Sequence, residues 1–189
     1  MPRIRTFIAI HPGQTIRNRI IKLRDSLIEQ GAQAKWVEED NLHITLLFLG
    51  EVDMVSLGNI CTAVSNCAQE FSPFSVKVET TGCFPNIRRP RVLWAGVTTG
   101  KEQVRELHDA LEQPLLDMGC YRREDRKYTP HLTIGRVKGD KHENNLSTLM
   151  SQWADWSAGE VNVDEILVMG SELKRDGPVY SVLSRTPLG

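Results

Sequence analysis

The chain carries His43-Ile44-Thr45-Leu46 and, further on, His131-Leu132-Thr133-Ile134, two copies of one four-residue pattern. In each copy polar and apolar side chains alternate, which is typical of a β-strand with one open and one covered face. Residues two positions apart on a strand share a face and lie roughly 6.5 to 7 Å apart along it. Each histidine therefore shares a face with its threonine, and we predict motif strands at 43–49 and 131–137.

The apolar side chains of the two motif strands are predicted to point away from the histidines. They are Ile44, Leu46 and Phe48 on the first strand, and Leu132 and Ile134 on the second. Helices are expected to cover this apolar face. The polar face is then left to line a groove, where two imidazoles and two hydroxyls surround one point.

The elements around the motifs recur in the same order. A helical period precedes each motif strand, at 13–30 and 101–118, and another follows it, at 53–69 and 141–156. Further strand patterns lie at 4–10, 74–80, 91–97, 160–169 and 178–184. No linker rich in Pro, Gly or Ser separates the halves, so we expect a single domain over residues 1–189 with two pseudo-symmetric lobes.

Turn residues close a strand pair in each half. They are Pro85, Asn86 and Pro90 in the first half, and Asp176, Gly177 and Pro178 in the second. Strands joined by such short turns are antiparallel, so we predict an α+β fold with two antiparallel sheets facing a central cleft and helices packed outside. Pro114 falls within the helical period 101–118, and its missing N–H predicts a kink or an end near Gln113.

Composition excludes several classes of protein. The 189 residues are 40% hydrophobic and 25% charged, with a formal net charge of -1, as in a folded globular chain rather than a disordered one. No run reaches the ~18 apolar residues of a membrane span, and the short apolar run after Arg5 does not make a signal peptide. The cysteines show no C-x-x-C pair and are expected to be reduced, so we predict a cytoplasmic protein.

The near-neutral net charge also argues against a surface made for nonspecific DNA binding. Any basic feature is therefore expected to be local. Two clusters qualify: Arg88, Arg89 and Arg91, and then Arg122, Arg123, Arg126 and Lys127.

A groove with two histidines and two threonines suits one compact phosphodiester. Imidazole titrates near pH 6.5, so one histidine can accept a proton while the other donates one. The threonine hydroxyls can donate hydrogen bonds to the nonbridging oxygens. A 2′,3′-cyclic phosphate fits best, because ring strain and a tethered leaving oxygen open it to acid–base catalysis, whereas ordinary diesters usually need metal ions. We therefore predict a hydrolase that uses no metal and no cofactor.

Other interpretations stay open at this point. In one, His43 and His131 are hydrogen-bonded core residues, although two buried histidine–threonine faces would each need polar partners. In another, the protein is a nucleotide- or RNA-binding module that keeps the cleft without catalysis. The remaining histidines, His11, His108 and His142, are expected at surface or helix-cap positions.

At these residues the sequence resembles the two-histidine phosphoesterase superfamily, specifically its RNA 2′,3′-cyclic phosphodiesterase branch, also called 2′,5′ RNA ligase-like proteins. The resemblance covers almost the whole chain. It is carried by residues 5–9, 36–45 (WVEEDNLHIT), 84–96 (FPNIRRPRVLWAG) and 128–136 (YTPHLTIGR). It implies a bilobal LigT-like fold, no metal, and hydrolysis of cyclic phosphate ends to 2′-phosphomonoesters, with some reverse ligation through a 2′,5′ linkage.

The resemblance also implies a role for each motif residue. It makes His43 the proton donor to the leaving 3′ oxygen and His131 the proton acceptor that activates water, roles that sequence symmetry does not distinguish. Thr45 and Thr133 are implied to bind the phosphate. The expected partners are RNA or nucleotides with 2′,3′-cyclic phosphate ends. Because one chain forms the whole cleft, a monomer is expected.

Four more residues are candidates for substrate contact. Regular strand alternation puts Arg136 on the face opposite the groove, so it reaches substrate only if Gly135 permits a bulge. Phe84 can stack on a base, and Arg88 or Arg91 can meet RNA phosphates. The alternative for these last three is a hairpin tip with solvated side chains.

Overall fold

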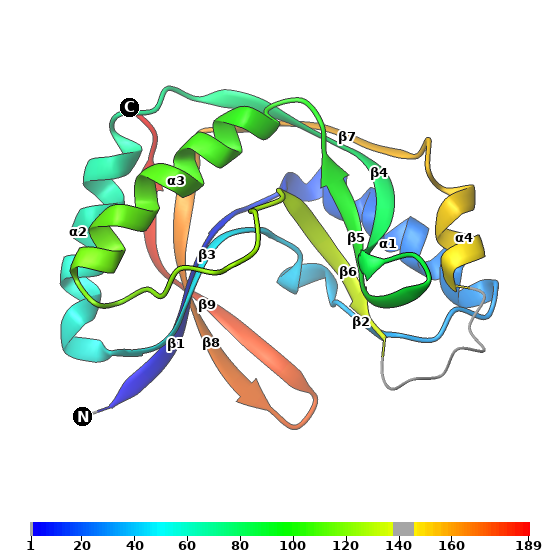
Figure 1. Ribbon diagram of the computed structural model, residues 1–189, viewed down its shortest axis with the longest axis horizontal. Coiled ribbons are helices and arrows are strands. Elements are labelled where there is room, and N and C mark those ends of the chain that lie inside the picture. Colours follow the sequence, from blue (N-terminus) through cyan, green and yellow to red (C-terminus); the bar gives the residue numbers. More distant parts are fainter. Residues whose placement is uncertain (1, 138–145) are drawn as a thin grey trace.

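The computed structural model describes residues 2–137 and 146–189, in which strands and helices alternate along the chain (Figure 1). The strands are β1 (Arg3–Ile10), β2 (Lys35–Trp36), β3 (Ile44–Asp53), β4 (Phe74–Asn86), β5 (Arg89–Val97), β6 (His131–Arg136), β7 (Ser157–Val163), β8 (Glu165–Lys174) and β9 (Gly177–Pro187). The helices are α1 (Gly13–Glu29), α2 (Leu57–Ala68), α3 (Lys101–Asp117) and α4 (Leu146–Gln152). The α+β class and the short hairpin turns are therefore confirmed.

The strands of the described residues form one antiparallel sheet. Its order is β7-β4-β5-β6-β3-β1-β8-β9, and β2 pairs with β6 outside this path. The motif strands β3 and β6 meet at the centre through a single residue pair, Ile44 with Leu132. The two separate sheets expected from the sequence are thus two halves of one curled sheet, because this pair makes the hydrogen-bonded ladder continuous across the centre.

Each half of the sheet combines distant segments of the chain. The half around β3 contains β1, β8 and β9, whereas the half around β6 contains β5, β4 and β7. In both halves the motif strand pairs with the strand that precedes its helix, β1 before α1 and β5 before α3. That the chain forms two pseudo-symmetric lobes stays a prediction. In this structure each predicted lobe would correspond to one half-sheet.

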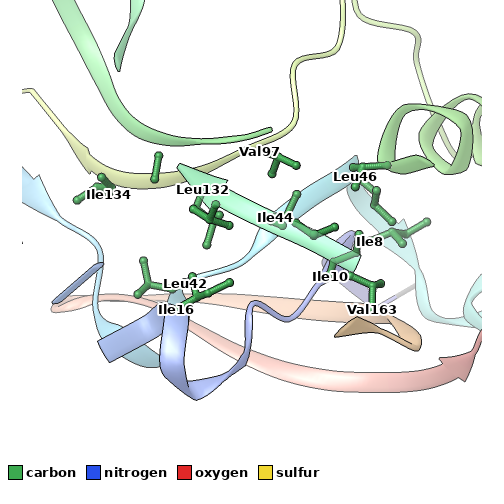
Figure 2. Close-up of a cluster of buried hydrophobic side chains, with 14 of the residues drawn as sticks. Ile8, Ile10, Ile16, Leu42, Ile44, Leu46, Val97, Leu132, Ile134 and Val163 are labelled. Atoms are coloured by element: carbon green, nitrogen blue, oxygen red, sulfur yellow. The ribbon is translucent and has the colours of Figure 1, made fainter. Parts of the chain in front are cut away.

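The helices pack their apolar stripes against the sheet and one another, as the helical periods predict. Helices α2 and α3 pack together beside β3 and β9, while α1 lies against β7 and α4 against β4 (Figure 1). The buried stripes are Ile16, Ile20, Leu23 and Leu27 of α1, Ile60, Val64 and Ala68 of α2, and Val104, Leu107, Leu111 and Leu115 of α3. Figure 2 shows Ile44, Leu46, Leu132 and Ile134 of the motif strands within the same core.

Three predicted elements differ from the structure or extend beyond it. The apolar run 160–169 is two strands, because at the exposed Asp164 the chain leaves the side of β4 and crosses to β1. Helix α3 continues past Pro114 to Asp117, since the buried Leu115 holds its last turn on the core despite a proline cost of ~3 kcal/mol. Of the predicted helix 141–156, the structure has α4, and residues 141–145 lie outside the described residues.

A close approach between β4 and β5 supports one wall of the cleft. Gly82 pairs with Trp94, and a Cβ added at Gly82 would overlap the indole ring. The same ring lies 5.3 Å from the ring of Phe84, which in turn contacts His131 at 4.9 Å. Glycine at position 82 therefore allows the aromatic stack behind one motif histidine to form.

We expect Gly82→Ala to lower the free energy of unfolding by about 1 to 3 kcal/mol, the usual cost of forcing an extra carbon into a filled space. Urea unfolding followed by tryptophan fluorescence measures the change. The matched control is Gly58→Ala in α2, where an added Cβ meets no atom within 4 Å and a gain of up to ~1 kcal/mol is expected. Equal effects of the two substitutions would contradict this account of Gly82.

Candidate active site

The four motif side chains lie together on one face of the sheet. Ile44 pairs with Leu132, and both side chains are fully buried in the core. Since side chains alternate along a strand, the residues on either side of this pair point the other way. Extending the antiparallel register by one residue places His43 opposite Thr133, and the other histidine and threonine opposite each other. The groove predicted from the sequence motifs is therefore present.

Both histidines are held by the same local hydrogen bond. The Nδ1 atom of His43 lies 2.7 Å from the carbonyl oxygen of Asn41, and Nδ1 of His131 lies 2.6 Å from that of Thr129. A carbonyl only accepts, so in each ring Nδ1 carries the hydrogen. The neutral ring then has its lone pair on Nε2, and that nitrogen is free to exchange a proton with a bound molecule.

Aromatic rings fix the orientation of both imidazoles. The ring of His43 lies 4.8 Å from Phe7 and 5.5 Å from Tyr180 of β9, in tilted and edge-on contacts. The ring of His131 meets Phe84 edge-on at 4.9 Å. These neighbours bury the imidazoles and limit their rotation, so both rings are preorganised.

Burial and nearby positive charge lower the pKa of both imidazoles. The pKa of His43 falls from 6.5 to about 4, mainly because burial penalises the charged ring, and also because His131 and Arg136 repel a second positive charge. The pKa of His131 is lowered too, again through burial and then Arg136, although the hydrogen bond to Thr129 opposes this. Arg136 therefore lowers the pKa of both imidazoles, and His131 also lowers the pKa of His43.

A bulge brings Arg136 to the cleft. In the pairing of β6 with β5, Thr133 and Gly135 face successive residues, so Ile134 between them has no partner. Such a bulge reverses the alternation of side chains beyond it, and Arg136 accordingly lines the cleft beside His43. Arg136 was predicted to reach the groove only if Gly135 permits a bulge, and this bulge is present.

An equivalent bulge lies in β3 and corrects the placement of Phe48. Ala9 pairs with Thr45 and Ile8 with Leu47, so Leu46 is skipped. Phe48 is therefore not in the core: its side chain is 40% exposed and lines the cleft. The sequence analysis predicted no bulge here, although the adjacent apolar residues 46 and 47 break strict alternation.

The main cleft has a volume of about 700 Å³. Its lining combines aromatic side chains with cations: Phe7, Trp36, Phe48 and Tyr180, and Arg5, Lys35, Arg136 and Lys174. Arg5 also covers the ring of Phe48 at 4.6 Å. Such a surface is suited to a flat, anionic ligand, because rings stack on bases and cations attract phosphate.

A smaller pocket of about 250 Å³ adjoins the main cleft. The two share Thr45 and Phe48, and the smaller one is also lined by His131 and Phe84. Tyr128 lies in its wall and donates a hydrogen bond from its hydroxyl to the carbonyl oxygen of Thr45 at 2.7 Å. This bond ties the segment before the second motif to the strand of the first.

The remaining candidates fall outside the cleft or differ from expectation. Arg88 and Arg91 are exposed at and beside the β4–β5 turn and line neither pocket. His11 is exposed and accepts a hydrogen bond from the N–H of Gly13 at the start of α1, in agreement with a cap role. His108 was wrongly expected at the surface: its side chain is buried because it stacks on Tyr128 at 4.0 Å. His142 lies outside the described residues.

The sequence motifs did not identify four of the residues that complete the site. They are Asn41, Tyr128, Tyr180 and Trp36. Asn41 contributes its backbone carbonyl oxygen, and Tyr128 donates a hydrogen bond to the backbone carbonyl oxygen of Thr45. Tyr180 lies on β9, far from both motifs in the sequence. The tryptophan lies on β2 opposite Gly135 of β6, where an added Cβ would crowd its ring.

The described part of the chain holds neither a metal-binding cluster nor a membrane-spanning helix. Within residues 2–137 and 146–189, no three or more His, Cys, Asp or Glu residues gather in a way that could hold a metal ion. In the same ranges no helix has the length and apolar character needed to cross a membrane.

Known proteins resemble this chain over nearly its full length. Residues 11–175 match the family described as the 2′-5′ RNA ligase superfamily. A protein of Methanothermobacter thermautotrophicus named RNA 2′,3′-cyclic phosphodiesterase is 35% identical, over 95% of this chain and 96% of its own. One of the same name from Aeropyrum pernix is 36% identical, over 87% and 92%.

Solved structures share the fold. The protein TT0787 of Thermus thermophilus superposes with a TM-score of 0.82 at 27% identity, covering 98% of each chain. LigT of E. coli, solved with 3′-AMP, gives a TM-score of 0.78 at 25% identity and covers 99% of each chain. The LigT-like fold implied by the sequence resemblance is therefore confirmed.

Substituting Arg136→Gln is expected to raise the pKa of both His43 and His131, because the guanidinium charge that disfavours their protonation is removed. Titration of the imidazole signals by NMR measures both values, with His43 starting at about 4. Arg91→Gln removes an equal charge from β5 outside the cleft and should leave both pKa values in place. If both variants shifted the histidine pKa values equally, the net charge of the protein, rather than the proximity of Arg136, would set these values.

Proposed function

Since the chain belongs to the 2′-5′ RNA ligase superfamily, we propose that it is an RNA 2′,3′-cyclic phosphodiesterase, the activity for which its curated relatives are named. One observation carries the proposal. Two imidazoles, each with Nδ1 tied to a carbonyl and Nε2 free, share one face of the sheet with two threonines. This arrangement supplies an acid, a base and hydroxyl donors around a single phosphorus atom.

The mechanism follows from these positions. His131 takes a proton from water through Nε2 while the water oxygen attacks the phosphorus atom. The bond from phosphorus to the 3′ oxygen breaks, and protonated His43 donates its Nε2 proton to that oxygen. The phosphate stays on the 2′ oxygen, so the product is a 2′-phosphomonoester. Each proton transfer contributes roughly 10² to 10⁴ in rate.

Thr45 and Thr133 donate hydrogen bonds to the nonbridging oxygens of the phosphate. Because strands β3 and β6 hold them rigidly opposite the histidines, they keep the phosphorus atom in line with the attacking and leaving oxygens. Arg136 adds a positive charge at the same cleft. Together these groups stabilise the negative charge that grows on the phosphate oxygens in the transition state.

Substrate binding prepares His43 for its role. In the free protein its pKa of about 4 keeps the ring neutral near pH 7. A bound phosphate brings a negative charge beside the ring, which favours protonation and raises the pKa again. The ring then enters the reaction as an imidazolium and, owing to its buried surroundings, releases its proton readily.

The main cleft holds the nucleoside that carries the cyclic phosphate. Its rings, among them Trp36 and Tyr180, offer stacking surfaces for a base, and its cations meet the phosphates of the preceding RNA. RNA or nucleotides with 2′,3′-cyclic phosphate ends are accordingly the proposed substrates. Reverse ligation, a monomeric state and a cytoplasmic location stay predictions from the sequence.

Incubation with adenosine 2′,3′-cyclic phosphate and excess EDTA is expected to give adenosine 2′-phosphate as the sole monophosphate. The acid–base route needs no metal, so the rate with chelator should equal the rate without it. Chromatography that separates the 2′ and 3′ isomers measures both yield and regiochemistry. A 3′-phosphate product, or activity that disappears with EDTA, would argue against the mechanism.

The same assay identifies the catalytic histidines. His43→Gln and His131→Gln should each lower kcat by about 10² to 10⁴ while the melting temperature changes little. His11→Gln is the matched control, because that ring is exposed outside both pockets. Nucleotide binding without turnover in the unmodified protein would favour the binding-module alternative.

The pH dependence of kcat/KM is expected to show its alkaline limb below pH 6.5. The pKa values of His43 and His131 are both lowered from 6.5 in the free protein, and the reactive form carries one proton on the pair. Above the higher of the two values this form declines by about tenfold per pH unit. Initial rates at low substrate concentration and constant ionic strength measure the profile. A flat or rising profile between pH 6.5 and 8 would contradict the assignment.

A further inference from the structure

Asn41 connects the first motif to a segment near the other end of the sequence. Its backbone carbonyl oxygen accepts the hydrogen bond from Nδ1 of His43 at 2.7 Å. Its side-chain nitrogen Nδ2 donates a hydrogen bond to the carbonyl oxygen of Pro178 at 3.0 Å, 137 residues further along the chain. One asparagine therefore joins the imidazole of the first motif to the start of β9.

The end of the β8–β9 hairpin that contains Pro178 receives little support from the sheet. Strand β1 pairs with β8 over residues 167–171, whereas β8 and β9 continue to pair with each other as far as Lys174 and Gly177. Residues 172–179 thus form a two-stranded ribbon, which Figure 1 shows projecting away from β1. Because a two-stranded ribbon alone is marginally stable in water, contacts with the rest of the protein must hold it in place.

The hairpin ribbon forms one wall of the main cleft. The lining includes its residues Lys174, Asp176, Pro178 and Val179. Tyr180, directly after the ribbon, also lines the cleft and contacts the ring of His43 at 5.5 Å. In the proposed function this cleft holds the nucleoside. A shift of the ribbon would therefore alter the wall of the nucleoside site and the surroundings of His43 together.

The carbonyl group that orients His43 is anchored on both sides. Asn41 ends the 3₁₀ helix Glu39–Asn41, and the next residue, Leu42, is extended and buried in the core. The carbonyl lies in the peptide between Asn41 and Leu42. Its direction is therefore set by a core contact on one side and by the bond to Pro178 on the other.

This carbonyl supports the chemical role of His43 in two ways. Burial lowers the pKa of His43, and the hydrogen bond to Asn41 opposes that effect because it favours the protonated ring. In the neutral ring the same bond keeps the hydrogen on Nδ1. If the carbonyl turned away, neither the orientation of the ring nor the position of its hydrogen would be fixed.

The second motif is anchored differently. Nδ1 of His131 is bonded to the carbonyl of Thr129, and the following residue, Pro130, is buried. The carbonyl oxygen of Pro130 accepts a hydrogen bond from the N–H of Val97 at 3.3 Å. The ring of His131 is therefore held from the centre of the sheet, and it can serve as an internal reference for changes at His43.

We propose that Asn41 is a positioning residue for the proton donor His43. Its side-chain bond to Pro178 fixes the carbonyl that orients the imidazole and also holds the hairpin ribbon beside it. The donor and the wall of the nucleoside site thereby keep one common geometry. The proposal rests on the function proposed above and adds a residue that acts through His43.

The first test observes the ring of His43 directly, without an activity assay. In Asn41→Ala the backbone carbonyl remains but loses its anchor, so part of the neutral His43 population should carry its hydrogen on Nε2. Two-dimensional ¹H–¹⁵N NMR of the ring nitrogens at neutral pH distinguishes the two forms, and the signals of His131 should stay in place. The matched control is Asn18→Ala, which removes a side-chain hydrogen bond to Gln14 on the exposed face of α1 and should leave His43 unchanged.

The second test asks whether Asn41 acts through His43 in the hydrolysis of adenosine 2′,3′-cyclic phosphate. Asn41→Ala should lower kcat about 2- to 10-fold, the rate equivalent of one hydrogen bond. Asn41→Leu keeps a similar size without a donor and should have the same effect. When His43→Gln is already present, adding Asn41→Ala should change the remaining rate by less than about twofold, because the group it positions is gone.

The opposite results would overturn the proposal. An unchanged His43 spectrum in Asn41→Ala would do so, and so would a normal kcat in Asn41→Leu, which would leave the side chain a space-filling role. An equal loss of kcat with and without the His43 imidazole, or a rise in KM alone, would likewise exclude positioning of the donor. If the unmodified protein does not hydrolyse the substrate, the proposed function fails, while the NMR comparison still decides whether Asn41 orients His43.

Discussion

A single antiparallel contact, Ile44 with Leu132, joins the two half-sheets and at the same time creates the site. Both side chains are buried in the core, so the flanking histidines and threonines must point to the opposite face. Because this pair alone joins β3 and β6 among the described residues, the strands diverge on both sides and the sheet curls around the cleft. Fold and site thus depend on one register, and a slip by one residue would exchange the polar and apolar faces.

The positive charge of the cleft attracts anions and disfavours protonation of the two imidazoles. Burial and Arg136 lower the pKa of both imidazoles, and the four cations of the main cleft outnumber the two carboxylates in its described lining, Glu38 and Asp176. In the proposed function, a bound phosphate supplies the missing negative charge and raises the pKa of one imidazole. Substrate binding would then be coupled to uptake of one proton, and two side chains of the same type could serve as acid and base.

Much of this arrangement was readable from the sequence because it depends on local periodicity. The motif strands, the helical stripes, the hairpins and the shared face of histidine and threonine all follow from patterns of 2 and 3.6 residues. The bulges in β3 and β6 were harder, since skipping Leu46 or Ile134 depends on the partner strand. The joined half-sheets, the buried His108 and the contact of Tyr180 with His43 arise between distant segments, and no local pattern reports them.

The position of β1 has a consequence for how the polypeptide is made. This strand lies between β3 and β8, so one of its edges is paired only after residues 165–174 have left the ribosome. The strands β4, β5 and β6 pair with neighbours that emerge soon after one another. The half-sheet of the second histidine can thus begin to assemble during translation, whereas the half that holds the first is completed last, with an unpaired strand exposed in the meantime.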